Sequence, residues 1–408
     1  MQLGAEGMFS RVKDRSALSV ALVVSGAHAV NDMYASFVPP LLPRIMGDLG
    51  LSITLATTLA VAFSVAAALP QPFFGFVADR YGRRGLAVLG PVISGVFVSA
   101  IAWATGFWSL LLLLLIGGIG SAAFHPPGAS YAVRVSEGRG GGARYSVFSF
   151  GGSVGFAMGP IAAVWLAQTK GMEGLWMAAL PVLLVAPFVY LGLPKEEVAA
   201  SNSSSTPPAV PKEVLRQLRG PLGLIFGISA VMAFVQRTFQ TMVPIIVAEN
   251  GGAETLGAIA LTAYFSAQAF GTVAGGLLSD RLDRPKLLAH LCFWALPAHA
   301  LAVWIGPAGT LGLALAAIAG FLGMATLPPV VVMAQEMIPN GTAASSGVVM
   351  GLAWATGALG VLGTGILADA IGPQAATLGS FPVALIAVAL ALHPSLGRAE
   401  AKENITRK

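Results

Sequence analysis

The residues of this sequence that could carry chemistry stand in stretches that are otherwise apolar. His28, Asn31 and Asp32 lie near the middle of one such stretch, where spacings of three and four residues put them on one helix face. His125 stands in a second apolar stretch and Arg237 in a third. A carboxylate and imidazoles can take up and release protons at physiological pH. We therefore expect Asp32 to be the main proton carrier, with His28 and His125 as helpers.

Arg237 suggests a binding site for an anionic group, in addition to the protons. Inside a bilayer a guanidinium needs a partner, which would be either an anionic part of a substrate or Asp32. Further substrate contacts are expected from polar side chains close to these two residues in sequence: Asn31, Tyr34, Gln236 and Gln240.

Other interpretations of the same residues stay open. Asp32 and Arg237 could form a buried ion pair, and the two histidines could be hydrogen-bonded residues of a quiet core. His28, Asp32 and His125 together also offer imidazole and carboxylate ligands suited to a divalent transition metal, although Arg237 nearby would repel a cation. A site for a divalent transition metal is therefore the alternative to a proton-carrying site at these three residues.

The stretches that hold these residues belong to a membrane protein. Hydrophobic residues make up 56% of the 408 residues, and charged residues make up 10%, against about 25% in soluble domains. This composition argues against a soluble enzyme and a nucleic-acid-binding protein, and the single cysteine, Cys292, rules out an intrachain disulfide. At about 20 apolar residues per crossing, we predict an all-α protein with twelve spans, near 17–43, 53–78, 86–105, 108–134, 145–168, 175–193, 221–247, 256–279, 287–306, 309–335, 344–369 and 374–393.

A polar interval rich in Ser and Pro divides these spans into two groups of six. We predict an N-terminal six-helix bundle over 1–193, a cytoplasmic linker over 194–220, and a C-terminal six-helix bundle with a short tail over 221–408. Of the 23 Lys and Arg residues, only Arg44 and Lys170 fall on the outer side if both termini are cytoplasmic. This bias predicts cytoplasmic N- and C-termini.

The two halves repeat a charged motif after their second span. The run from Gly75 to Arg84 reads GFVADRYGRR, and the run from Gly276 to Lys286 reads GLLSDRLDRPK. A Pro-Pro pair also recurs in the fourth span of each half, at Pro126-Pro127 and at Pro328-Pro329. Repeats of this length are typical of a duplicated six-helix bundle.

The repeated loop motif resembles that of the major facilitator superfamily, and the resemblance covers essentially the whole chain. It implies two pseudo-symmetric six-helix bundles and a conformational latch that joins cytoplasmic helix ends in the outward-facing state. The latch residues would be Gly75, Asp79, Arg80, Gly82, Arg83, Gly276, Asp280, Arg281 and Arg284. Gly151, Gly155 and Gly159, followed by Pro160, resemble the fifth-span motif of the superfamily's antiporters. Helix hinges would then lie at Gly155, Gly159, Pro160, Pro126 and Pro127.

A narrower resemblance is to the fosmidomycin-resistance branch of the superfamily. The runs GAHAVNDMY from Gly26 to Tyr34 and SAAFHP from Ser121 to Pro126 carry it. An acidic residue is expected after the His-Pro pair, and Pro127 stands there instead. The resemblance implies efflux of a drug or metabolite, driven by a proton gradient without a cofactor. We expect a functional monomer in a bacterial-type inner membrane that binds protons, a small-molecule substrate and lipid, and no resident metal or nucleic acid.

Overall fold

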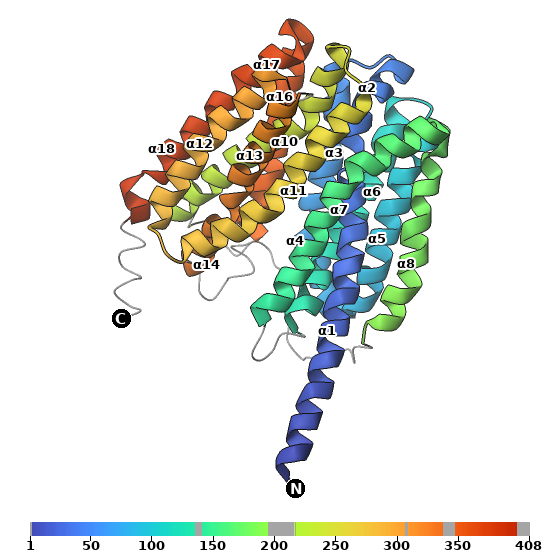
Figure 1. Cartoon of the computed structure of the whole chain (residues 1–408), viewed down its shortest axis with the longest axis vertical. Coiled ribbons are helices and arrows are strands. Elements are labelled where there is room, and N and C mark those ends of the chain that lie inside the picture. Colours follow the sequence, from blue (N-terminus) through green and yellow to red (C-terminus); the bar gives the residue numbers. More distant parts are fainter. Residues whose placement is uncertain are drawn as a thin grey trace.

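The computed structural model describes residues 2–134, 141–194, 216, 218–306, 309–337 and 347–397, and these residues form helices joined by short turns (Figure 1). The N-terminal half comprises α1 (Gln2–Ala35), α2 (Val38–Leu49), α3 (Ile53–Ala68), α4 (Gln71–Tyr81), α5 (Arg83–Ser99), α6 (Phe107–Arg134), α7 (Gly141–Lys170) and α8 (Ala179–Gly192). The C-terminal half comprises α10 (Pro221–Glu249), α11 (Glu254–Ser279), α12 (Arg284–Ile305), α13 (Thr310–Ala325), α14 (Leu327–Met337), α16 (Ala353–Ile371), α17 (Pro373–Ser380) and α18 (Ala384–Ala391).

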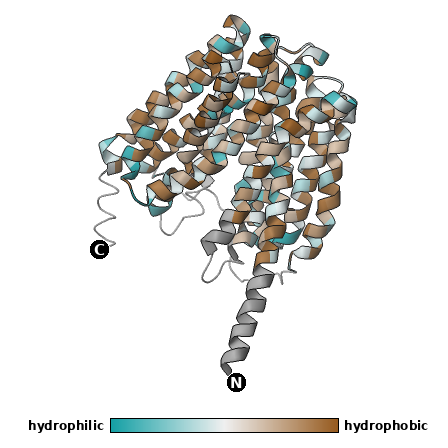
Figure 2. Ribbon diagram, viewed as in Figure 1, coloured by the Kyte–Doolittle hydropathy of each residue, from teal (hydrophilic) through white to brown (hydrophobic). Residues whose placement is uncertain are grey.

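The membrane crossings follow the predicted spans. Eleven segments of the described chain are long and apolar enough to cross a bilayer, from Ile53–Tyr81 to Pro373–Ala391, and they match the second to twelfth predicted spans. The first predicted span, 17–43, corresponds to the second half of α1 and the start of α2, and it is the one that carries His28, Asn31 and Asp32. Apolar residues run along the whole length of the helices (Figure 2). Large side chains such as Trp108 and Phe188 are exposed, as expected on a lipid-facing surface.

The two halves repeat contacts as well as sequence. In the N-terminal half the Ser25 hydroxyl donates to the Val147 carbonyl over 2.7 Å, and in the C-terminal half Ser229 donates to Val349 over 2.8 Å. Each bond joins the first membrane span of a half to the fifth span of the same half. The first glycine of each loop motif also packs toward the proline pair of its own half, Gly75 toward Pro126 and Gly276 toward Pro328. The duplicated sequence therefore builds a duplicated bundle.

The described hydrogen bonds between the halves gather toward the end opposite the charged loop motifs. Arg44 of α2 donates from Nε and Nη2 to the Glu254 carboxylate at the start of α11, over 2.9 and 2.7 Å. Asp369, near the end of α16, accepts from the first backbone N–H groups of α3, Ile53 N at 2.8 Å and Thr54 N at 2.9 Å. A carboxylate at a helix N-terminus is stabilised by the unpaired N–H groups and by the helix dipole. The halves are therefore fastened at this end.

The loop motifs make their described bonds within their own halves. Asp79 forms an ion pair with Arg83, one helical turn away across the α4–α5 junction. Arg84 donates to the Tyr190 carbonyl of α8 and lies over the Tyr190 ring. Arg284 forms an ion pair with Glu336 of α14 at 2.6 Å. These bonds of the latch motifs lie within each half, whereas the bonds of Arg44 and Asp369 join the two halves at the opposite end.

The proline pairs differ between the halves. Pro126 and Pro127 lie inside α6, which continues as a helix through both. In the C-terminal half α13 ends at Ala325 and α14 begins at Leu327, so a helix break directly precedes Pro328 and Pro329. Most of the predicted linker, 195–215 and residue 217, lies outside the described residues, and the division into two domains stays a prediction.

Candidate functional site

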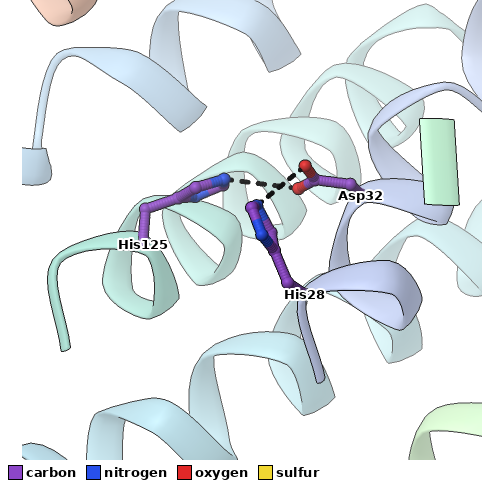
Figure 3. Close-up of side chains that lie close together, drawn as sticks. All are labelled: His28, Asp32 and His125. Carbon is purple, nitrogen blue, oxygen red and sulfur yellow. Dashed lines mark ion pairs between the residues drawn. The ribbon is translucent and has the colours of Figure 1, made fainter. Parts of the chain in front are cut away.

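Three titratable side chains converge inside the N-terminal half. His28 Nε2 lies 3.0 Å from Asp32 Oδ2, one helical turn along α1, and His125 Nε2 reaches across from α6 to within 3.3 Å of Asp32 Oδ1. Figure 3 shows both rings pointing at the carboxylate. His28 and Asp32 are buried, whereas the His125 side chain keeps 28% of its exposure. The structure thus brings together the three residues predicted to carry protons.

The tautomers of both histidines follow from their second hydrogen bonds. His28 Nδ1 lies 2.8 Å from the Phe148 carbonyl, and His125 Nδ1 lies 2.8 Å from the Ser121 carbonyl. A carbonyl oxygen only accepts hydrogen bonds, so each Nδ1 carries a hydrogen. In the neutral ring each Nε2 then carries a lone pair. Both lone pairs therefore face the Asp32 carboxylate.

The two histidine Nε2 atoms and the Asp32 carboxylate can bind protons between them. Each contact between an Nε2 and a carboxylate oxygen is a hydrogen bond only when one proton lies on it, so the three side chains can share up to two protons. When no proton is bound, the lone pairs of the two imidazoles and of the carboxylate face one another. The three side chains then carry one net negative charge in the membrane interior, and burying an unpaired charge there is costly. With two, the group carries one net positive charge.

Asn31 anchors the carboxylate to α6. Its Nδ2 donates to Asp32 Oδ1 and to the Ser121 hydroxyl, each over 3.0 Å, and its Oδ1 is buried without a hydrogen-bond partner. Tyr34, predicted as a substrate contact, packs inside the N-terminal half, and its role toward a substrate stays a prediction. It is fully buried, and its hydroxyl donates to the Ala178 carbonyl over 2.6 Å. In this conformation Tyr34 packs within the N-terminal half instead of presenting its hydroxyl to a substrate.

Glycines of α7 let this helix approach α1 closely. A Cβ at Gly155 would collide with the Ala29 carbonyl, and a Cβ at Gly159 would collide with Ser36 and the Met33 carbonyl. A Cβ at Gly152 would lie 2.5 Å from the His28 ring and 2.7 Å from Asp32 Oδ2. Because α7 is one continuous helix through Pro160, these glycines have a packing role here. The predicted hinges at Gly155, Gly159 and Pro160 stay predictions.

Arg237 lies in the other half and is not paired with Asp32. Its Nη1 donates to Gln240 Oε1 over 3.2 Å, and its guanidinium lies 5.5 Å from the centroid of the Trp354 ring in α16. No carboxylate of the described residues lies within ion-pair distance of it. Asp32 and Arg237 interact only through their longer-range electrostatic field. The buried ion pair considered from the sequence is therefore absent from this conformation.

The remaining predicted polar contacts belong to the same region of the C-terminal half. Gln236 donates to the Gly323 carbonyl over 3.4 Å and accepts from Gln268 Nε2 over 2.8 Å. Gln240, also buried, holds Arg237. Gln236 thus fastens α10 to α11 and α13, and Gln240 is the amide in direct contact with the guanidinium.

Sequence reasoning did not single out three residues that contact these groups. Ser121 and Gly152 look like ordinary small residues of apolar helices, and Trp354 is a single aromatic residue in a span. Ser121 alone carried a signal, since it begins the run that ends in His125-Pro126. The partners of the other two depend on how α7 and α16 pack, which a single sequence does not contain.

Comparison with known proteins decides the family. The sequence profile of the Major Facilitator Superfamily matches residues 24–344 and 225–407. The chain belongs to this superfamily. It is a transporter and not an enzyme, as the predicted fold class and the loop motif indicated.

Similar proteins include proteins named for drug resistance. The fosmidomycin resistance protein of Escherichia coli (strain K12) is 27% identical over 374 residues, which cover 88% of this chain and 89% of that protein. The multidrug resistance protein MdtG of Escherichia coli O9:H4 is 26% identical over 62% of this chain and 64% of its own length. A crystal structure of a bacterial homologue of the human lysosomal transporter Spinster, inward-facing and unoccupied, covers 95% of this chain and 98% of its own, with a TM-score of 0.74 and 18% identity. The predicted resemblance to the fosmidomycin-resistance branch is thus confirmed as a similarity.

Proposed function

We propose that the protein is a proton-coupled antiporter that exports a small amphiphilic or anionic compound across a bacterial-type inner membrane. The observation that carries this proposal is the meeting of His28, Asp32 and His125 at membrane depth, with both Nε2 atoms aimed at one carboxylate. The similarity to drug-resistance proteins supports export as the direction of transport. The protein would work as a monomer with cytoplasmic termini.

Protons would enter and leave through His125. It is the most exposed of the three side chains, and it comes from a different helix than the other two. A small shift of α6 against α1 would lengthen its contact with Asp32 and change how many protons the group holds. Asn31 would then keep the carboxylate in place, because its amide donates both to Asp32 on α1 and to Ser121 on α6.

Arg237 would bind the anionic part of the substrate in the opposite half. An anion there and protons near Asp32 attract each other, so local electrostatics alone favours binding both together. Exchange of one for the other therefore requires the conformational change between inward- and outward-facing states. A neutral amphiphile would lack this attraction.

The contacts that join the two halves at one end of the bundle fit alternating access. If the loop motifs are cytoplasmic, this conformation is closed on the outside, with Arg44–Glu254 and Asp369–α3 as the fastenings. In the outward-facing state the latch motifs, including Gly75, Asp79 and Asp280, would take over on the cytoplasmic side.

Transport of a divalent transition metal is the alternative. The ligand atoms of His28, Asp32 and His125 lie within 4.8 Å of one another, close enough to hold one ion. Two of the relatives named above are drug-resistance proteins by name, and Arg237 would repel a cation. Metal-dependent stabilisation of the purified protein that is lost in His125→Ala, together with metal uptake into vesicles, would favour this alternative.

The test of proton coupling begins with a screen for toxic compounds to which overexpression gives resistance. Reconstituted vesicles with an imposed pH gradient then measure uphill transport of such a compound. We expect Asp32→Asn to abolish gradient-driven accumulation and to retain substrate binding. Folded Asp32→Asn protein that still accumulates the compound would eliminate Asp32 as the proton carrier.

A further inference from the structure

The C-terminal half buries a tyrosine–histidine pair that takes no part in the proposed proton site. Tyr264 of α11 and His299 of α12 have no exposed surface, and the Tyr264 hydroxyl lies 3.1 Å from His299 Nε2. The rings of Tyr264, Phe239 and Phe381 surround the imidazole, with centroids 5.4 to 5.8 Å from its own. Burying polar groups among apolar side chains is costly unless each has a hydrogen-bond partner. Apolar side chains could fill this space at lower cost.

The N-terminal half fills the matching space with apolar side chains. When the two loop motifs are aligned, Phe63 takes the place of Tyr264 and Val98 takes the place of His299. The packing agrees with this alignment, because in each half a glycine of the fourth span packs against the backbone carbonyl of Phe63 or Tyr264. Phe63 and Val98 are both buried in the hydrophobic core. The repeated bundle can therefore pack without a hydroxyl and an imidazole here, which points to a role for them beyond packing.

The direction of the Tyr264–His299 hydrogen bond follows from the second nitrogen of the imidazole. His299 Nδ1 lies 2.7 Å from the Ala295 carbonyl, which only accepts, so Nδ1 carries a hydrogen. In the neutral ring Nε2 then accepts, and the Tyr264 hydroxyl donates to it. A hydroxyl has one hydrogen, so toward every other neighbour the Tyr264 oxygen can only accept.

Two glutamines lie on the accepting side of this hydroxyl. The side chains of Gln268 and Gln240 are both within hydrogen-bonding reach of Tyr264. Because the Tyr264 oxygen accepts, each glutamine turns its amide nitrogen toward it. The oxygen of Gln240 then faces Arg237, whose Nη1 donates to it over 3.2 Å. The nitrogen of Gln268 also donates to Gln236 Oε1 over 2.8 Å, so its orientation is fixed twice.

We propose that Tyr264 and His299 are positioning residues for the Arg237 guanidinium. They act by fixing which end of the Gln240 amide faces it. Without the Tyr264 hydroxyl, this amide could turn over and present its NH₂ group, and a guanidinium, which has only donors, cannot bond to that group. The inference deepens the proposed function, in which Arg237 belongs to the transport site, but the hydrogen-bond chain itself exists without a substrate.

Nitrogen NMR of the purified protein, without substrate or gradient, tests this chain. With isotope-labelled histidine, the His299 signals are those missing from His299→Gln, and we expect a hydrogen on Nδ1 and none on Nε2. With isotope-labelled arginine, the Arg237 signals are those missing from Arg237→Lys. Tyr264→Phe should speed rotation of this guanidinium about its Nε–Cζ bond by roughly two- to tenfold, the worth of one neutral hydrogen bond. Tyr34→Phe, which removes another buried hydroxyl, should leave the rotation unchanged.

The double variant Tyr264→Phe/His299→Val separates positioning from packing. It copies the apolar pair of the N-terminal half, so we expect it to fold. Arg237 should nevertheless rotate as fast as in Tyr264→Phe, because Gln240 has lost the acceptor that orients it. His299→Gln can place an oxygen near the position of Nε2, so it should keep the slow rotation that His299→Val loses. A role in packing alone predicts slow rotation in the folded double variant.

Transport gives a second readout, and this one depends on the proposed function. The substrate is a compound to which the overexpressed protein confers resistance. In the double variant we expect its KM to rise roughly two- to tenfold, with a smaller change in the maximal rate. Proton coupling should persist, because Asp32 lies in the other half.

Either of two NMR results would overturn the proposal. One is a hydrogen on Nε2 instead of Nδ1 of His299 in the unchanged protein, because the Tyr264 oxygen would then accept from the ring and could donate to Gln240. The other is unchanged rotation of Arg237 in the folded double variant. Failure of the proposed function is seen separately, as an absence of proton movement with the compound in the unchanged protein, and the NMR results do not depend on it.

Discussion

Removing the charge of Glu254 should loosen the outer closure of the transporter. In Glu254→Gln the fork of Arg44 loses its carboxylate, while its third bond, from Nη1 to the Ala167 carbonyl at 3.2 Å, can persist within the N-terminal half. The pair joins α2 to the first residue of α11, so this substitution acts on a contact between halves. The expected result is a shift of the population away from this conformation toward the outward-open one.

The size of the shift follows from the setting of the pair. Exposed ion pairs contribute about 0.2–1 kcal/mol, and hydrogen bonds to charged groups contribute about 1.5–3 kcal/mol. The Arg44 and Glu254 side chains retain 27% and 21% of their exposure, beside an open pocket of about 540 Å³. With two parallel bonds and partial burial, we expect about 1–2 kcal/mol, which changes the ratio of the two states by roughly five- to thirtyfold.

Distances between spin labels on the outer ends of α2 and α11 measure this ratio. Glu173→Gln is the matched control, because Glu173 lines the same pocket and makes no described ion pair. Raising the salt concentration should mimic Glu254→Gln in part, since a partly exposed pair is screened. An unchanged distance distribution in Glu254→Gln, with Asp369 intact or replaced by Asn, would refute the reasoning that these contacts close the outer side.

Three further predictions concern other parts of the molecule. Asp79→Asn should slow turnover and lower the outward-facing population with little change in substrate affinity, which the same spin-label distances and a binding assay measure; an unchanged population would contradict the latch. Gly152→Ala should displace His28 and Asp32 and cost about 1–3 kcal/mol of stability, so that thermal unfolding and proton-driven transport both fall, whereas Gly26→Ala, where a Cβ meets nothing within 4 Å, should keep its stability. A cysteine at Ser204, in the predicted linker, should react only with a reagent that enters the cell; labelling of intact cells by an impermeant reagent would reverse the predicted topology.

Local spacing predicted part of the site, because it acts within one helix. His28 and Asp32 stand four residues apart, and this alone places them on one face of α1, where the structure joins them. The sequence did not indicate that the Tyr34 hydroxyl donates to the Ala178 carbonyl. A spacing assigns a residue to a face, but the neighbouring helix decides what that face meets.

Contacts between distant segments lay beyond the sequence. Arg44 and Glu254 are both charged residues near span ends, and nothing local indicates that they meet across the two halves. His125 and Asp32 were both predicted to carry protons, but their contact between α6 and α1 is known only from the structure. Arg237 was expected to have either Asp32 or a substrate as its partner, and only the packing of α10 against α16 showed Trp354 beside it.

Proton movement driven by substrate tests the central claim most directly. Vesicles containing the protein, with a pH-sensitive dye inside and no initial pH gradient, receive a gradient of a compound to which the overexpressed protein confers resistance. We predict that protons move opposite to the compound in the unchanged protein, and that this movement disappears in Asp32→Asn while the compound still binds. Protons that move in the same direction as the compound, or that do not respond to it at all, would contradict proton-coupled antiport.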